Sequence, residues 1–146
     1  MTRFTHDNSV LRFCVDRAEK NTISGRLFSR RLTQPIEFSN LSTLVLKLED
    51  VFDQQGFPQA FQRARVFLRE ERRVEYAAPE LSQGMDAAYV SAQRGAAATF
   101  EVQVLTRRNS SWQGRVDWLD GQGRQEFSSC LELIRLVYSR LFENML

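Results

Sequence analysis

The chain has 146 residues, which is the length of one compact domain. Apolar residues make up 42% of it and charged residues 26%, a balance typical of globular proteins that excludes the disordered, collagen-like and coiled-coil classes. Because 20 basic side chains stand against 18 acidic ones, the formal net charge is only +2, and this overall charge does not by itself require nucleic acid or an acidic membrane as a partner.

The first third of the chain has the pattern of three strands followed by a helix. Apolar and polar residues alternate from Leu11 to Asp16, which is typical of a strand with one buried face. A second strand is expected from Ile23 to Leu27, and a short third strand ends at Phe38. Ser39-Asn40 can cap the first turn of a helix, and Gly56, followed closely by proline, can end it.

Residues 55–98 form a connecting segment in two parts. The first, Phe61 to Tyr76, is charged and predicts one further strand at Ala64 to Leu68. The second, Ala77 to Ala98, is rich in Ala, Gly, Ser and Gln. This composition predicts a weakly ordered connection with a short helix near Met85 to Ser91.

The last third of the chain repeats the pattern of three strands and a helix. Strands are expected from Phe100 to Val104, from Trp112 to Trp118, and over a short segment that ends at Phe127. The stretch Asp120-Gly121-Gln122-Gly123 supplies the glycines that a tight hairpin turn needs. A helix is expected over about residues 129–143, and both tryptophans are expected in the core because they share a face with apolar neighbours.

Residues 10–54 and 99–143 match without a gap at seven of 45 positions, and their apolar periods coincide. A shared period of this kind indicates a duplicated unit. We therefore expect an α+β fold in which residues 1–146 form a single domain of two pseudo-symmetric βββα units, with an antiparallel sheet packed against two helices. The alternative is a coincidental match of two amphipathic segments. The identical pairs are Val15 and Val104, Gly25-Arg26 and Gly114-Arg115, Glu37-Phe38-Ser39 and Glu126-Phe127-Ser128, and Leu44 and Leu133.

Four short phrases of the last third carry a family resemblance: Trp112-Gln113-Gly114, Trp118-Leu119, Phe127-Ser128 and Glu132-Leu133-Ile134. They resemble a group of short uncharacterised proteins from Clostridia-like Gram-positive bacteria, in which a Trp-containing hairpin leads into a terminal helix. The first half of the chain, from Gly25 onwards, resembles a companion module of the same group. The resemblance implies common ancestry, and it implies no activity, ligand or catalytic residue.

The residue inventory excludes the common catalytic sites, and we expect no catalytic residues, no metal and no cofactor. His6 is the only histidine, so a Ser-His-Asp triad or a multi-histidine metal site cannot form within one chain. Cys14 and Cys130 are expected to pack as apolar groups, and this use of cysteine favours the cytoplasm. One minor alternative is carboxylate chemistry, with Asp117 opposite Glu126 and with Glu101 on the same face.

A set of arginines forms the best candidate for a charged binding surface. Arg63, Arg65 and Arg69 lie in the central segment among aromatic residues, a combination that suits phosphates and stacked bases. Arg26 and Arg115 can extend this surface on the sheet. The competing interpretation is a solvated region in which arginines pair with neighbouring acids.

Protein contact is the leading functional hypothesis. The last helix carries apolar residues outside its main stripe, and Leu131, Tyr138 and Phe142 are the candidate interface residues. We therefore expect a small, non-enzymatic, cytoplasmic binding or adaptor protein that contacts another protein or a second copy of itself. The alternative is an arginine-dependent nucleic-acid binder. No membrane association is expected, since no apolar run approaches the ~20 residues of a membrane span.

Overall fold

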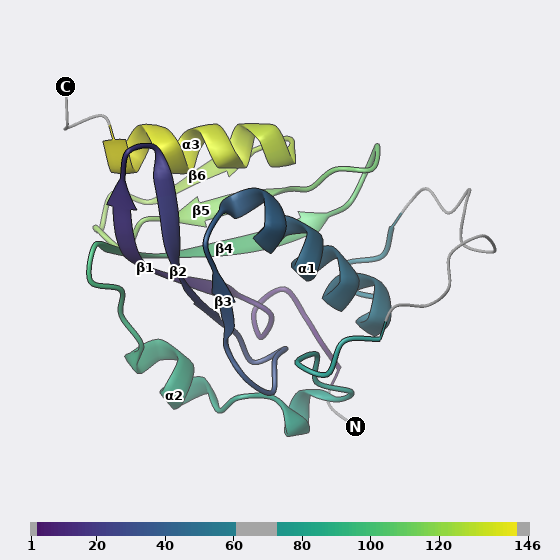
Figure 1. The fold of residues 1–146 in the computed structure, drawn as a ribbon. Helices are drawn as coiled ribbons and strands as arrows, with labels where there is room; N and C mark the ends of the chain where they lie inside the picture. The colour runs from purple at the N-terminus through teal and green to yellow at the C-terminus, as the bar shows by residue number, and fades with distance from the viewer. Residues whose placement is uncertain (1–2, 61–72, 143–146) are drawn as a thin grey trace.

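The computed structural model describes residues 3–60 and 73–142. Its elements follow one another as three strands and a helix, a short helical connection, and again three strands and a helix (Figure 1). The predicted strand over residues 64–68 lies outside the described residues. The elements are β1 (Leu11–Glu19), β2 (Thr22–Phe28), β3 (Ile36–Phe38), α1 (Leu41–Gln55), a single 3-10 turn (Leu81–Gln83), α2 (Ala87–Ala92), β4 (Ala98–Thr106), β5 (Gln113–Asp117), β6 (Arg124–Phe127) and α3 (Cys130–Phe142).

The strands form one antiparallel sheet of six strands in the order β3-β2-β1-β4-β5-β6. The two long strands β1 and β4 pair at its centre, where Arg12 lies opposite Glu101. The short strands β3 and β6 form the two edges. The predicted α+β class and the antiparallel sheet are therefore confirmed.

Two glycines of the sheet lie close against the backbone of the neighbouring strand. Gly25 of β2 faces Val15, next to an irregularity in the register of β1, and Gly114 of β5 faces Val104, next to the same kind of irregularity in β4. A Cβ atom added to Gly25 would lie 2.1 Å from the carbonyl oxygen of Cys14, and one added to Gly114 would lie 1.9 Å from that of Gln103. Both positions therefore require glycine.

The main core joins one face of the sheet to α1 and α3. Buried residues of all six strands and of both helices belong to one apolar cluster, and Trp112 and Phe52 at its centre have no exposed surface. Burying a large apolar side chain contributes roughly 1.5–3 kcal/mol, so this cluster is the main source of stability. The predicted place of Trp112 in the core is confirmed. Trp118, which was also expected there, is only half-buried.

Both long helices begin at the predicted caps. Asn40 accepts a hydrogen bond from the Thr43 N–H at 2.8 Å, and Ser129 accepts one from the Glu132 N–H at 3.0 Å. Gly56, with φ of 65°, ends α1 in the left-handed conformation. None of the described helices has the length and apolar character needed to cross a membrane.

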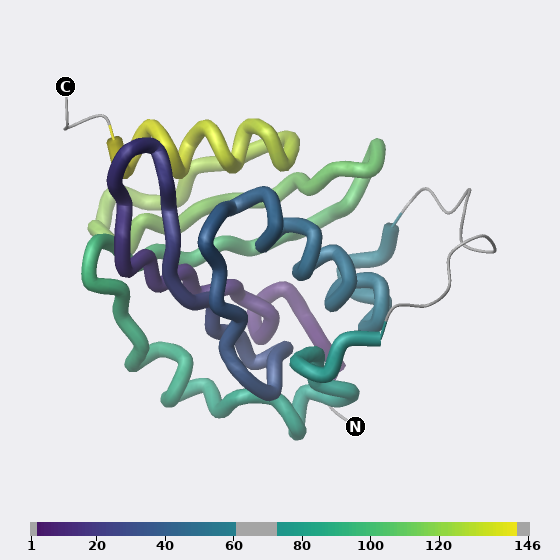
Figure 2. The backbone as a smooth tube through the Cα atoms, viewed as in Figure 1, coloured from purple at the N-terminus to yellow at the C-terminus, as the bar shows by residue number. Residues whose placement is uncertain are grey.

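The segment that contains α2 packs on the other face of the sheet. Cys14 and Phe28, which point away from the main core, form a second apolar cluster with Val90 of α2. Backbone bonds hold this segment along its length, including one of 2.8 Å from the Ala97 N–H to the Val15 carbonyl. Figure 2 shows the segment, in teal, as it runs along the lower rim towards β4. The predicted short helix is confirmed as α2. The contacts of its segment with the sheet were not predicted, because they join residues far apart in the sequence.

Candidate functional site

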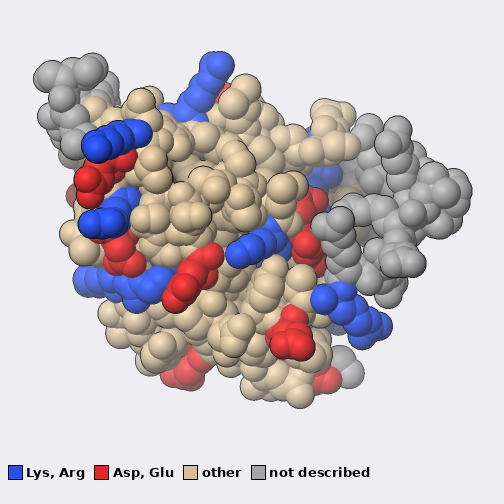
Figure 3. Space-filling model, in the orientation of Figure 1, with Lys and Arg blue, Asp and Glu red and all other residues tan. Residues whose placement is uncertain are grey.

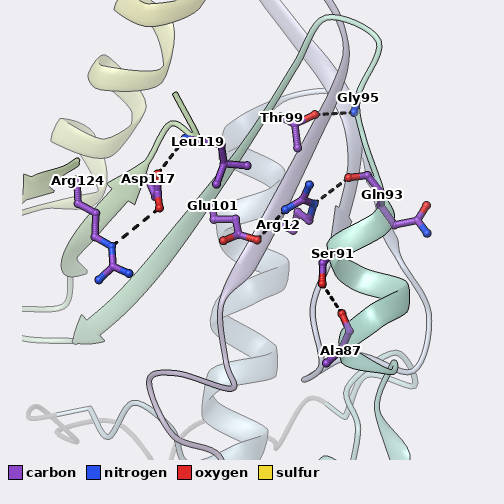
Figure 4. Close-up of polar contacts among 10 residues, drawn as sticks. All are labelled: Arg12, Ala87, Ser91, Gln93, Gly95, Thr99, Glu101, Asp117, Leu119 and Arg124. Carbon is purple, nitrogen blue, oxygen red and sulfur yellow. Dashed lines mark hydrogen bonds and ion pairs between the residues drawn. The ribbon is translucent and has the colours of Figure 1, made fainter. Parts of the chain in front are cut away.

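The polar face of the sheet is organised around a buried arginine (Figure 4). The Arg12 side chain is only 5% exposed, and its Nη1 lies 2.8 Å from Glu101 Oε2 on the neighbouring strand. Its Nε donates to the carbonyl of Gln93, just after α2, at 2.8 Å. Because a buried charge needs a charged partner and hydrogen bonds, these contacts tie β1, β4 and the α2 segment together.

Arg26, a predicted binding residue, is held by Asp16 in a two-bond contact. Its Nε and Nη2 donate to the two carboxylate oxygens at 2.9 and 3.1 Å, and Nη2 also donates to the carbonyl of Arg94. The hydrogen bonds from Arg26 lower the pKa of Asp16 below its ordinary value of 3.8, against the opposing effect of burial. The guanidinium is therefore largely occupied inside the protein.

This ion pair predicts a pH-dependent loss of stability in an Asp16→Asn variant. A carboxyl whose pKa is lowered by folding stabilises the native state above its unfolded pKa, and the contribution disappears as the pH falls through the folded value. Because both side chains are about one-third exposed, we expect a loss of about 0.5–1 kcal/mol at pH 7. Urea unfolding should show that the variant and the parent protein converge well below pH 3.8.

Glu80→Gln is the matched control, since Glu80 is exposed and its side chain caps nothing. Its free energy of unfolding should follow that of the parent protein at every pH. An Asp16→Asn variant with the same stability as the parent at pH 7 would show that the ion pair contributes nothing.

Arg115, a second predicted binding residue, is also engaged on the sheet. Its Nε donates to Gln103 Oε1 at 2.7 Å, and Gln103 in turn donates to the carbonyl of His6 at 3.1 Å. The ring of His6 lies against Phe57, so the N-terminal segment contacts the rest of the fold. These contacts give His6 a structural role.

Of the predicted arginine surface, the structure describes only Arg26 and Arg115, and these two lie apart. Arg26 lies on β2 and Arg115 on β5, with β1 and β4 between them, which separates the two backbones by about 14 Å. Arg63, Arg65 and Arg69 lie outside the described residues. Within the described residues, the predicted surface therefore consists of Arg26 and Arg115 alone, on strands that are not neighbours.

The predicted pairing of Asp117 with Glu126 is wrong. Asp117 lies opposite Arg124, and Glu126 lies opposite Arg115, a register two residues away from the expected one. Opposite charges across a strand pair favour this register, whereas the expected one would face two carboxylates. Glu101 was expected on the same face as Asp117, and it lies opposite Asp117 on the neighbouring strand. Arg12 and Arg124 lie against these two carboxylates.

Neither cysteine has the environment of a reactive thiol. Burial raises the pKa of Cys14 and that of Cys130, so both remain protonated near neutral pH. Both are free, Cys14 fully buried and Cys130 half-buried. Across the described ranges, no three potential metal ligands gather in one place.

A second buried arginine, Arg31, follows β2 in the sequence and packs against the C-terminal end of α1. No pattern in the sequence singles it out. It is 2% exposed, with Phe52 and Phe57 ring centroids 4.5 and 5.4 Å from its guanidinium carbon. Its Nε donates to Gln55 at 2.8 Å and its Nη2 to the Phe57 carbonyl. Burial, with a smaller contribution from the charge of Arg107, lowers the pKa of Arg31 to about 9, so the group stays cationic at neutral pH.

Arg107, whose guanidinium carbon also lies 5.6 Å from the centroid of the Phe52 ring, has acidic partners. Its Nη1 lies 2.7 Å from Asp53 and 3.3 Å from Glu49, both on α1, and its Nε donates to the Pro58 carbonyl at 2.7 Å. Glu49 also accepts a hydrogen bond from the indole of Trp112. The group therefore anchors α1 to the end of β4, and only a three-dimensional structure reveals it.

Apolar side chains also surround a small opening between α1 and α3. The cavity has a volume of about 10 Å³, enough for one water molecule at most, so it is too small for a metabolite. Figure 3 shows a stretch of uncharged residues above the centre of this view, with charged groups next to it and along the edge of the molecule. The lining residues are Phe13, Leu41, Leu44, Val45, Leu48, Trp112, Leu133, Ile134 and Val137.

The three predicted interface residues of α3 differ in their exposure. Leu131 is 58% exposed. Tyr138 and Phe142 are half-buried against the main core, and the Tyr138 hydroxyl donates to the Asn21 carbonyl at 3.1 Å. Of the three, Leu131 is therefore the residue with most surface to offer a partner.

No family model, no curated protein and no solved structure matches this chain. The resemblance to the uncharacterised bacterial group therefore stays a prediction.

Proposed function

We propose that the chain is a small, non-enzymatic, cytoplasmic binding or adaptor protein that contacts another protein through the apolar surface of α1 and α3. The observation that carries this proposal is the opening between these helices, which is lined only by apolar side chains. Ile134 of its lining lies one helical turn from Leu131, which is 58% exposed. A small apolar opening with an exposed leucine beside it suits an apolar side chain of a partner protein.

The charges of the sheet favour this proposal over nucleic-acid binding. A phosphate-binding surface needs guanidinium groups that are free to meet the backbone of the nucleic acid. Arg12, Arg26 and Arg115 already donate to side chains of the sheet itself. The nucleic-acid alternative therefore depends on Arg63, Arg65 and Arg69, which lie outside the described residues.

We also propose that the two βββα units arose by duplication, with α1 and α3 covering one face of the sheet. The strand order supports this, since it leads outwards from β1 through β2 to β3 and from β4 through β5 to β6. Gly25 and Gly114 face Val15 and Val104 next to register irregularities, and each of these pairs is 89 residues apart. A binding surface between α1 and α3 then lies where the two units meet.

Site-specific cross-linking tests the proposed contact. A photo-reactive residue at Leu131 should capture a partner protein in the native cell, and Ile134→Glu in the same chain should weaken that capture about tenfold or more. The control position is Tyr89 on α2, which is 49% exposed and packs against Phe28 of the second cluster. Equal capture at both positions would overturn the proposal.

The salt dependence separates the two functions. Contact between apolar surfaces should persist as salt is added, whereas phosphate-driven binding falls steeply. Capture that is lost at high salt and after nuclease treatment would favour the nucleic-acid alternative.

A further inference from the structure

The two edges of the sheet differ in their fitness to pair with another strand. An edge strand carries unpaired backbone N–H and C=O groups that another strand can complete. At the β3 edge, Pro35 precedes the strand and lacks an N–H, and Glu37 is the only exposed residue between buried Ile36 and Phe38. The β6 edge has no proline, and Arg124, Gln125 and Glu126 are all exposed.

The residues of β6 are complementary to themselves in an antiparallel arrangement. Arg124 and Glu126 are two residues apart, so they lie on the same face of the sheet. If β6 pairs with β6 of a second copy about a two-fold axis at Gln125, Arg124 of each copy faces Glu126 of the other. The same operation at the β3 edge would place Glu37 opposite Glu37, and like charges directly opposite are destabilising.

Both charged groups of β6 are available in the single chain. Arg124 is 51% exposed, and its Nε is 4.0 Å from Asp117 Oδ2, which is the long limit of an ion pair (Figure 4). Within the ranges that the structure describes, Glu126 forms no ion pair, and Arg115 opposite it donates its Nε to Gln103. Since residues 124–126 are all exposed, α3 leaves this edge accessible.

We propose that two copies of this chain associate through β6, in an antiparallel pairing that extends the sheet from one copy into the other. Across the junction the charges alternate, from Asp117 and Arg124 of one copy to Glu126 and Arg115 of the other. The interface is closed by its two-fold symmetry, and the outward β3 edges do not propagate it. The short strand makes this a reversible contact, and it uses a surface other than the one in the proposed function.

Sedimentation velocity of the full chain over a range of concentrations tests this dimer. The parent protein should show a monomer-dimer equilibrium that weakens as salt screens the two ion pairs. Arg124→Glu and Glu126→Arg each replace two attractive contacts by two repulsive ones, so each variant should dimerise about tenfold or more weakly.

An equimolar mixture of these two variants gives the decisive measurement. The Arg124→Glu chain carries two acidic side chains on β6, and the Glu126→Arg chain carries two basic ones at the same positions. Opposite charges then face each other at both contacts, so the mixture should form a heterodimer of about parental affinity although each variant alone does not dimerise well. Glu37→Arg at the other edge is the matched control and should leave the equilibrium unchanged.

Three results would overturn the inference: a parent protein that is monomeric at the highest concentration reached, a dimer unaffected by either charge reversal, or a mixture that does not associate. If Ile134→Glu abolishes the dimer while the charge reversals do not, self-association belongs to the α1 and α3 surface. The two proposals can therefore fail separately.

Discussion

Replacing Gly25 or Gly114 by alanine is expected to lower the free energy of unfolding by about 3 kcal/mol, a large effect for adding one methyl group. The added Cβ would lie 2.1 Å from the Cys14 carbonyl oxygen in the first case and 1.9 Å from that of Gln103 in the second. Backbone atoms cannot turn aside as the end of a side chain can, so the central strand pairs must shift. Urea unfolding followed by tryptophan fluorescence measures the loss.

Gly121→Ala is the matched control. Gly121 has a φ of 80°, but no atom lies within 4 Å of its added Cβ, so only backbone strain of about 1–2 kcal/mol is expected. A Gly114→Ala variant as stable as Gly121→Ala would contradict the close approach of β4 and β5. Losses of similar size at Gly25 and Gly114 would also support the proposed duplication, since the two glycines face Val15 and Val104 at matching register positions.

The helices and strands were predictable because their signals are local. Asn40 and Ser129 cap the first turns of α1 and α3, and the glycine after α1 ends it by its own backbone preference. Alternation of apolar and polar residues identified the strands β1 and β4, although it did not indicate that they pair at the centre of the sheet. Each of these signals acts within a few residues of the element it specifies.

The features that were missed depend on residues far apart in the sequence. The β5 and β6 register depends on which charges face each other, and a shift of two residues keeps the same faces buried, so apolar alternation could not decide it. The segment of α2 is held by contacts such as that of Val90 with Cys14 and Phe28. Its composition gave no sign of these partners.

In the candidate site, too, the strand that carries a residue could be predicted, whereas the partners of its side chain could not. Arg26 and Arg115 were correctly placed on sheet strands, but whether an arginine is free to bind depends on its partners. The bond from Arg26 to Asp16 crosses from β2 to β1, and the bond from Arg115 to Gln103 crosses from β5 to β4. Acceptors on the predicted neighbouring strand are the one signal in the sequence that could have suggested these contacts.

Replacing Arg107 by methionine is expected to lower the free energy of unfolding by about 3 kcal/mol. Methionine fills much of the same space, so the loss comes mainly from the charges left behind. Asp53 and Glu49 would lose their shared guanidinium, and the Pro58 carbonyl would lose its donor. Removing one member of a buried ion pair costs roughly 3–5 kcal/mol, and the one-third exposure of the two acids places this case at the lower end. Urea unfolding of the variant beside the parent protein measures the difference.

Arg31→Met separates the effect of the ion pairs from that of burial. Arg31 is at least as deeply buried as Arg107, yet it bonds to the neutral oxygens of Gln55 and Phe57 and leaves no carboxylate uncompensated. Replacing it also removes the cost of burying a charge, so the net change should be about 1 kcal/mol or less. Equal losses in the two variants would mean that packing around Phe52, and not charge, controls this region. Because the two cations repel each other, each single variant already relieves that repulsion, so the double variant should lose more stability than the sum of the single ones.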